Sequence, residues 1–228
     1  MISGYTINVS KNMPQKVASG FDKVFEGWTG AKYVPIAYLG SKQVENGINH
    51  ALLVEQNLIT AQDVHSIVLL ILHDKAGDAD GSQLNVAEIK PIFSNGGKQL
   101  LGGITIAPTT DIPGDAQAIF DKHYAGFLGA NTKAFALLAT QMVNGVAYYF
   151  AVESTIVGNH VSDEINSVVV DPTIKTIQIV TLYSYFNQID TIDVLSGFAP
   201  VMKSDGSAPT DASVRPLIPA ALADVNWP

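Results

Sequence analysis

The sequence predicts an α+β protein built from two tandem units, each with one helix packed on a curled four-stranded antiparallel sheet. The first observation behind this fold class is an internal repeat at an offset of 99 residues, in which 12 of the 36 positions from 4 to 39 are identical in the second copy. Average composition would give roughly two or three identities by chance. The second observation is that each copy places a helical pattern ahead of apolar segments joined by an Asn-Gly pair, a strong short signal for a β-hairpin.

The repeat divides the 228 residues into three expected parts. Unit 1 spans 1–98, unit 2 spans 99–199, and a Pro/Ala-rich C-terminal extension covers 200–228. Each unit opens with a short extended segment, at 5–9 and at 104–107, which leads into the helix.

A helix is expected at 13–28 and at 112–128, because apolar residues recur there with helical spacing and a proline stands just inside each start. The faces expected to be buried are Val17, Phe21, Val24, Phe25 and Trp28 in the first helix and Ala116, Phe120, His123, Tyr124 and Phe127 in the second. The strands expected after the helices are 33–42, 48–58, 64–73 and 84–93 in unit 1, and 133–140, 146–156, 175–186 and 191–198 in unit 2. An insertion at 158–173 interrupts unit 2.

Composition excludes several classes of function. Lys and Arg number 13 against 21 Asp and Glu, a net charge of −8, so the chain lacks the cations for a nucleic-acid-binding face. No cysteine is present, which excludes disulfides, Cys-ligated metals and a cysteine nucleophile. The longest apolar stretch, 67–72, has six residues, and the first residues lack the pattern of a signal peptide. We therefore expect a soluble cytoplasmic protein that does not enter a membrane.

Residue patterns typical of catalysis or metal binding are missing from the sequence. The five histidines have no paired ligand spacing, and neither a phosphate-binding loop nor a nucleophile elbow is present, so we expect no enzyme, no cofactor and no metal. His123 lies on an apolar helix face and is interpreted as a core histidine. The acidic segment with Asp74, Asp78 and Asp80 lacks further ligands that a calcium loop needs, so we interpret it as a solvated turn.

One motif does carry functional information. The predicted turn of unit 2 reads Gln141-Met142-Val143-Asn144-Gly145 and matches the pattern Q-x-V-x-G at every defined position. The turn of unit 1 reads Gln43-Val44-Glu45-Asn46-Gly47 and keeps the Gln and the Gly, with Glu where Val is expected. This motif, placed at a hairpin after a helix and present twice, resembles the cystatins, which inhibit papain-like cysteine proteases. The absence of cysteine and the opening residues 1–4 are similar to the stefins, the intracellular cystatins without disulfides.

The resemblance implies a cystatin-like fold in each unit and an apolar wedge that occludes the cleft of a papain-like cysteine protease. The wedge would consist of Gly4 with 43–47, or of Gly103 with 141–145. The glycine permits close backbone approach, and the flanking apolar side chain adds buried area. The chain departs from the family at the second hairpin, where an aromatic residue is usual: unit 1 has the polar segment 73–82, and unit 2 has 186–190 without a Trp.

Three functions stay open at this point. The first is inhibition of a papain-like cysteine protease. The second is a non-inhibitory protein-interaction module on the same tandem fold, in which the motif residues serve only as a hairpin scaffold. The third is a ligand-binding or enzymatic relative, which would need a pocket with convergent ionisable residues that the sequence does not reveal.

Overall fold

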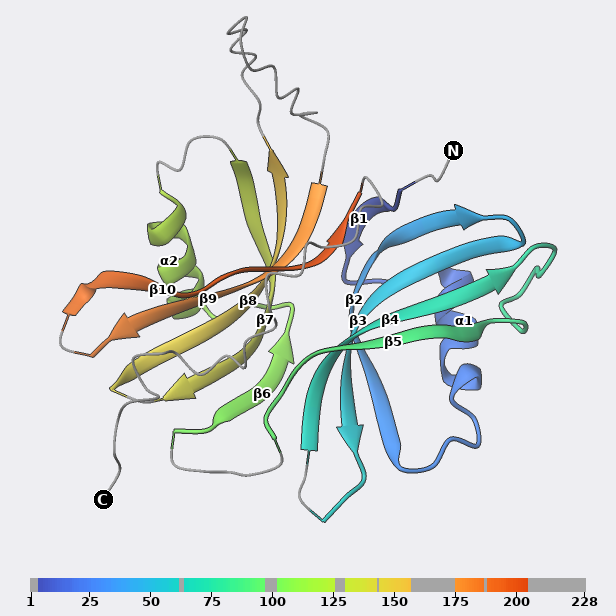
Figure 1. The fold of residues 1–228 in the computed structure, drawn as a ribbon, viewed down its shortest axis with the longest axis horizontal. Helices are drawn as coiled ribbons and strands as arrows, with labels where there is room; N and C mark the ends of the chain where they lie inside the picture. Colours follow the sequence, from blue (N-terminus) through green and yellow to red (C-terminus); the bar gives the residue numbers. More distant parts are fainter. Residues whose placement is uncertain are drawn as a thin grey trace, which may run out of the picture.

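The computed structural model describes residues 4–61, 64–96, 102–125, 130–142, 144–156, 175–186 and 188–204. Within these ranges the chain forms two five-stranded antiparallel sheets and two helices, which confirms the α+β class (Figure 1). The insertion at 158–173 and most of the expected C-terminal extension lie outside the described residues.

Sheet 1 has the strand order β1-β2-β3-β4-β5, and its helix lies between the first two strands in the chain. Its elements are β1 (Thr6–Ser10), α1 (Gln15–Val24), β2 (Ala31–Val44), β3 (Gly47–Leu58), β4 (Val64–Lys75) and β5 (Asn85–Ser94). Sheet 2 repeats this topology with the order β10-β9-β8-β7-β6. Its elements are β6 (Ile104–Thr109), α2 (Gly114–Tyr124), β7 (Ala130–Met142), β8 (Gly145–Ile156), β9 (Lys175–Tyr185) and β10 (Gln188–Lys203).

The expectation of four strands per sheet is wrong, because the segment before each helix pairs along the outer edge of the strand that follows the helix. Thr6 pairs with Ser41 in sheet 1, and Ile104 pairs with Gln141 in sheet 2. Gly40 makes the first pairing possible, since a Cβ atom there would lie 2.1 Å from the carbonyl oxygen of Thr6. At the other end of the chain, β10 continues to Lys203 and so includes the first residues of the expected extension.

Both helices are shorter than expected. The prolines at 14 and 113 take the N-cap positions, with extended ψ angles of 139° and 144°, and the helices begin after them. Val17 and Phe21 are buried against sheet 1, and Ala116 and Phe120 are buried against sheet 2, as predicted. Trp28 was expected in the buried face, but α1 ends four residues earlier and the indole is half exposed.

The apolar residues form three layers. One cluster lies between α1 and sheet 1, another between α2 and sheet 2, and the largest contains residues of both sheets. Along β3, Ala51 and Leu53 belong to the shared cluster, whereas Leu52 and Val54 face α1. The same alternation explains the six-residue apolar run 67–72 of β4: both faces of the strand are buried. The helices therefore lie on the outer sides of a pair of packed sheets (Figure 1).

An aromatic contact and an ion pair cross between the units at the ends of this central layer. The rings of Phe93 and Tyr149 pack with their centroids 5.6 Å apart. Lys11, after β1, forms an ion pair with Asp111, after β6. The two sequence repeats therefore share one hydrophobic core.

Candidate functional site

The structure places both copies of the motif at hairpins, as the Asn-Gly pairs predicted, although the turn of sheet 1 begins one residue before its pair. In sheet 1, Val44 pairs with Gly47, so Glu45 and Asn46 form a two-residue turn between β2 and β3. In sheet 2, Met142 ends β7 and Gly145 begins β8; Asn144 is exposed, and Val143 lies outside the described residues.

The predicted N-terminal contact lies at the same end of sheet 1 as this turn. Gly4 is two residues before Thr6, and Gln43 is two residues after Ser41, the partner of Thr6. Antiparallel pairing therefore directs Gly4 toward the β2–β3 turn. In sheet 2 the equivalent segment is internal: Gly103 directly precedes β6, which pairs with Gln141 through Ile104.

The glycine of each motif is required by the sheet itself. Gly47 has a φ of +151°, and a Cβ atom there would lie 2.0 Å from the carbonyl oxygen of Asp74 on the neighbouring strand β4. A Cβ atom at Gly145 would lie 2.4 Å from the carbonyl oxygen of Ser184 on β9. Both turns thus need a glycine so that the adjacent strand can approach.

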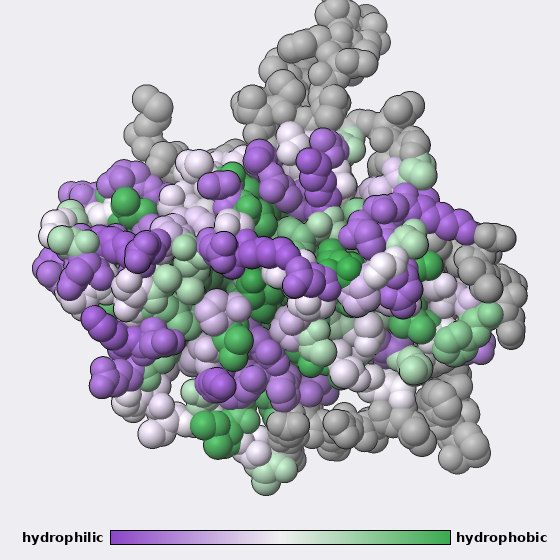
Figure 2. Space-filling view, turned by 180° about the vertical axis from the view of Figure 1, so that it is seen from behind, coloured by the Kyte–Doolittle hydropathy of each residue, from purple (hydrophilic) through white to green (hydrophobic). Residues whose placement is uncertain are grey.

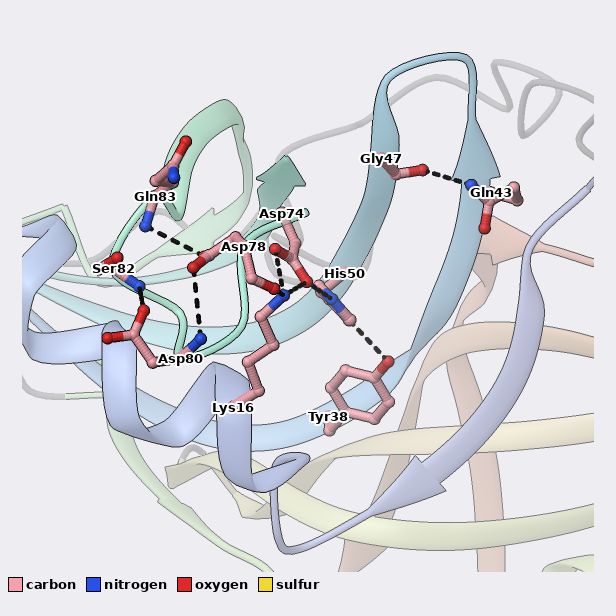
Figure 3. Close-up of polar contacts among 10 residues, drawn as sticks. All are labelled: Lys16, Tyr38, Gln43, Gly47, His50, Asp74, Asp78, Asp80, Ser82 and Gln83. Atoms are coloured by element: carbon pink, nitrogen blue, oxygen red, sulfur yellow. Dashed lines mark hydrogen bonds and ion pairs between the residues drawn. The ribbon is translucent and has the colours of Figure 1, made fainter. Parts of the chain in front are cut away.

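The glutamine of each motif also holds its own hairpin. Gln43 Nε2 donates to the carbonyl oxygen of Gly47 at 2.9 Å (Figure 3). Gln141 Nε2 donates to the carbonyl oxygen of Gly102 at 2.7 Å, and its Oε1 accepts a hydrogen bond from the Tyr149 hydroxyl at 3.0 Å. The Gln and the Gly of each motif are therefore engaged within the chain.

The turn end of sheet 2 is apolar and exposed. Met142 is 65% exposed and Phe186 is 58% exposed, and they are two of the four large hydrophobic residues that stand exposed in the described ranges. The pairing of Gly145 with Tyr185 places the β7–β8 turn beside the start of the β9–β10 turn, so both side chains lie at one end of the sheet. Behind them, the rings of Tyr183 and Tyr185 pack edge to face with centroids 4.7 Å apart.

Met142 was among the predicted contact residues, whereas Phe186 was not. The signal for Phe186 was an aromatic residue at the end of a predicted strand, which does not reveal exposure. Elsewhere, exposed apolar side chains are scattered: on the face in Figure 2 they form small patches separated by hydrophilic residues.

The corresponding end of sheet 1 is polar and folded back on its helix. Glu45 and Asn46 are exposed at the turn. The loop that follows β4 approaches α1, where Lys16 Nζ lies 2.6 and 2.7 Å from the two carboxylate oxygens of Asp74 and also donates to the carbonyl oxygen of Asp78 (Figure 3).

The expectation of a solvated acidic turn at this loop is wrong for two of its three carboxylates. Asp74 and Asp78 are buried. Lys16 compensates the first, and the second accepts hydrogen bonds from the backbone N–H groups of Asp80, at 3.4 Å, and Gln83, at 3.1 Å. Asp80 is the exposed member, and hydrogen bonds from Ser82 lower the pKa of its carboxyl group. Paired and hydrogen-bonded carboxylates are tolerated inside a protein where free ones are not.

The structure gives little support for a metal site or a ligand pocket in the described residues. Within the described ranges, no group of three or more His, Asp or Glu side chains is arranged to hold a metal ion. His123 is half-buried with its ring 4.8 Å from that of Tyr124, and burial lowers its pKa. A hollow of about 420 Å³ lies at the seam of the units, but its ionisable lining residues, Lys11 and Asp111, are exposed and paired with each other. Among the described helices, none has the length and apolar character needed to cross a membrane.

No protein-family model matches this chain, and a search of curated proteins finds no significant relative.

Proposed function

We propose that this protein is a cystatin-like binding module that docks through the turns at the exposed end of sheet 2, and that its partner is a papain-like cysteine protease whose cleft it occludes. The observation that carries the proposal is the pair of exposed apolar side chains, Met142 and Phe186, on neighbouring turns. The Q-x-V-x-G motif at the first of these turns supplies the class of partner.

The energetics favour docking at this end. Fully burying an exposed Met or Phe side chain contributes about 1.5–3 kcal/mol. Because Met142 and Phe186 are 65% and 58% exposed, burying the exposed part of both would supply about 2–4 kcal/mol, or roughly 30- to 1,000-fold in affinity. Gln141 of β7 accepts a hydrogen bond from Tyr149 of β8, and Gly145 lets β9 approach the start of β8, so both residues fix the base of the hairpin before binding. A preorganised turn loses little conformational entropy on docking. The resemblance to the cystatins implies inhibition by occlusion of the cleft rather than by a reaction with the catalytic group.

The equivalent end of sheet 1 is less suited to an apolar cleft. Glu45 occupies the turn, and burying its charge would be costly without a partner cation. The neighbouring loop is fastened to α1 by Lys16. We therefore propose one docking end and a stoichiometry of one protease per chain.

The test is a titration of papain with the full-length protein and matched variants. Wild type is expected to inhibit, whereas Met142→Glu and Phe186→Glu are expected to weaken inhibition by roughly 100-fold or more each, because each removes an apolar contact and adds a buried charge. Ile59→Glu is the matched control, since Ile59 is 74% exposed but follows β3 in sheet 1. Equal losses for all three variants would assign the effect to general charge and refute the proposed docking end.

Absence of inhibition by micromolar wild type would refute the protease as partner. The remaining candidate would then be the non-inhibitory interaction module. The observation that favours this alternative is the position of Gly103 inside the chain, because the family's wedge uses a free N-terminal segment and unit 1 precedes this one.

A further inference from the structure

A histidine lies in the buried polar cluster between α1 and sheet 1. His50 on β3 is flanked by Tyr38 on β2 and Asp74 on β4, and Lys16 of α1 covers the cluster (Figure 3). The Tyr38 hydroxyl is 3.0 Å from His50 Nδ1. On the other side of the ring, Nε2 lies 3.7 Å from Asp74 Oδ2, too far for a hydrogen bond, and no other described residue supplies a hydrogen-bond partner for it.

The carboxylate beside this histidine is shared with a contact that fastens a loop. Lys16 Nζ binds Asp74 and also donates to the carbonyl oxygen of Asp78, which ties the loop at 76–84 to α1. The loop also touches the helix through two glycines: a Cβ atom at Gly20 would lie 2.3 Å from the carbonyl oxygen of Gly81. Lys16 supplies the polar contact between this loop and α1, so the position of its ammonium group determines whether that contact is made.

We propose that His50 is a pH-sensitive switch that controls whether the loop at 76–84 is fastened to α1. With neutral His50, Asp74 pairs with Lys16 and the loop is held. Protonated His50 places two cations against one buried carboxylate, and an uncompensated buried charge is costly. The Lys16 side chain is the more accessible cation, at 30% exposed against 9% for His50, so it moves to solvent. Asp74 then accepts from Nε2, and the carbonyl oxygen of Asp78 loses its donor.

The groups around the ring determine the pH range of the switch. Lys16 faces it from α1, Tyr38 from β2 and Asp74 from β4, and Asp78 lies next to Lys16 in the loop. Burial lowers the pKa of His50 and Lys16 lowers it further, whereas Asp74 raises it, and the net direction is downward. The fastened state is therefore the state at neutral pH, and release occurs below pH 6.5, the ordinary pKa of a histidine.

This device lies at the end of sheet 1, separate from the proposed docking end of sheet 2. The N–H of Ala76, at the start of the loop, donates to the carbonyl oxygen of Asn46 at 2.9 Å, so loop release would reshape the surface beside the β2–β3 turn. The two proposals do not depend on each other.

The experiment is amide hydrogen exchange on the full chain at pH 7.5 and pH 5, corrected for the intrinsic pH dependence of exchange. In wild type, the loop amides of Asp78, Gln83 and Leu84 are expected to exchange roughly tenfold faster, or more, at pH 5, while amides of the central strands β3 and β4 stay protected. His50→Gln, which has no titratable ring, is expected to abolish the pH effect. Lys16→Met is expected to open the loop at both pH values.

His73→Gln is the matched control. His73 is the histidine of β4 whose Nδ1 contacts Asn49 Oδ1 at 2.9 Å, and its replacement is expected to leave the loop response unchanged. Loop protection that is independent of pH in wild type, or a pH response that persists in His50→Gln, would overturn the proposal. If β3 and β4 lose protection in His50→Gln, that variant is unfolded, and a closed loop in Lys16→Met at pH 7.5 is then the overturning result.

Discussion

The shared core between the two sheets makes a quantitative prediction about Tyr149. Its side chain is 1% exposed, lies in the cluster that contains residues of both sheets, and packs on Phe93 of the other unit. Burial raises the pKa of its hydroxyl group to about 12, so the hydroxyl stays protonated and donates a hydrogen bond to Gln141 Oε1. Tyr149→Ala removes the contacts that this ring makes with residues of both sheets.

The expected cost is that of deleting a buried aromatic ring, about 3–5 kcal/mol of the free energy of unfolding. Tyr149→Phe keeps the ring and loses only the hydrogen bond, for about 0.5–1.5 kcal/mol. With a urea m-value of about 2.5 kcal/mol per M, Tyr149→Ala lowers the unfolding midpoint by roughly 1–2 M.

The assay is Trp28 fluorescence, which reports the unfolding of unit 1, whereas the mutation is in sheet 2. In a Trp227→Phe background, Trp28 is the only indole, and it lies next to α1 with its ring 5.4 Å from that of Phe25. Because the sheets share one core, the Trp28 fluorescence transition is expected to move together with the circular dichroism transition. A Trp28 transition that keeps its wild-type midpoint while only part of the dichroism signal shifts would refute the shared core and indicate two independently folding units.

Three further predictions concern the end of sheet 1. Gly47→Ala is expected to lower the free energy of unfolding, measured by urea denaturation, by about 2–4 kcal/mol, because the new Cβ would overlap a β4 carbonyl oxygen. Gly77→Ala is the control: Gly77 has a φ of +86° but open space around it, so the expected loss is about 1 kcal/mol. Lys16→Met leaves the buried carboxylate of Asp74 without its cation, and thermal melts at pH 7.5 should report a loss of about 1–3 kcal/mol, reduced from the value for a fully buried pair because Lys16 is partly exposed. Burial lowers the folded-state pKa of His50, so the unfolded chain binds more protons below pH 6.5 and the free energy of unfolding falls as the pH drops through that value. The urea midpoints at pH 7.5 and pH 5 should therefore differ less in His50→Gln than in wild type. An equal difference in the two proteins would contradict the assignment of this pH dependence to His50.

Local chemistry made the hairpins predictable from the sequence. An Asn-Gly pair between apolar segments predicts a hairpin, and both hairpins form at the pairs, although in sheet 1 the turn residues are Glu45 and Asn46 and Gly47 already belongs to β3. The 3.6-residue spacing predicted the burial of Val17, Phe21, Ala116 and Phe120, which is confirmed. Trp28, predicted on the same face as Val17, is half exposed, and Phe127 lies outside the described residues. What these predictions share is that each depends on residues within one or two turns of chain.

The features that the sequence did not reveal all depend on distant partners. The fifth strand of each sheet pairs across a helix, and the short segment before the helix does not identify its partner strand. The contact of Lys16 with Asp74 joins residues 58 apart in sequence. One sequence feature does indicate the shared core. A strand with apolar residues on both faces, such as 67–72, must be packed against another element on each face, and the single helix of a unit packs against only one of them.

The packing of the two units also limits where a partner can bind. Each sheet has one face under its helix and the other under the second sheet, so only strand edges and strand ends remain. The four edge strands are poorly suited to pairing with another chain. β1 and β6 have only five and six residues, β5 carries exposed Glu88, Lys90 and Pro91, and β10 is interrupted by four shifts in register. The strand ends carry the exposed apolar residues, with Ile59 after β3, Met142 at the end of β7 and Phe186 after β9. Two of these three lie on adjacent turns of sheet 2, and this concentration is the physical reason to place recognition at that end.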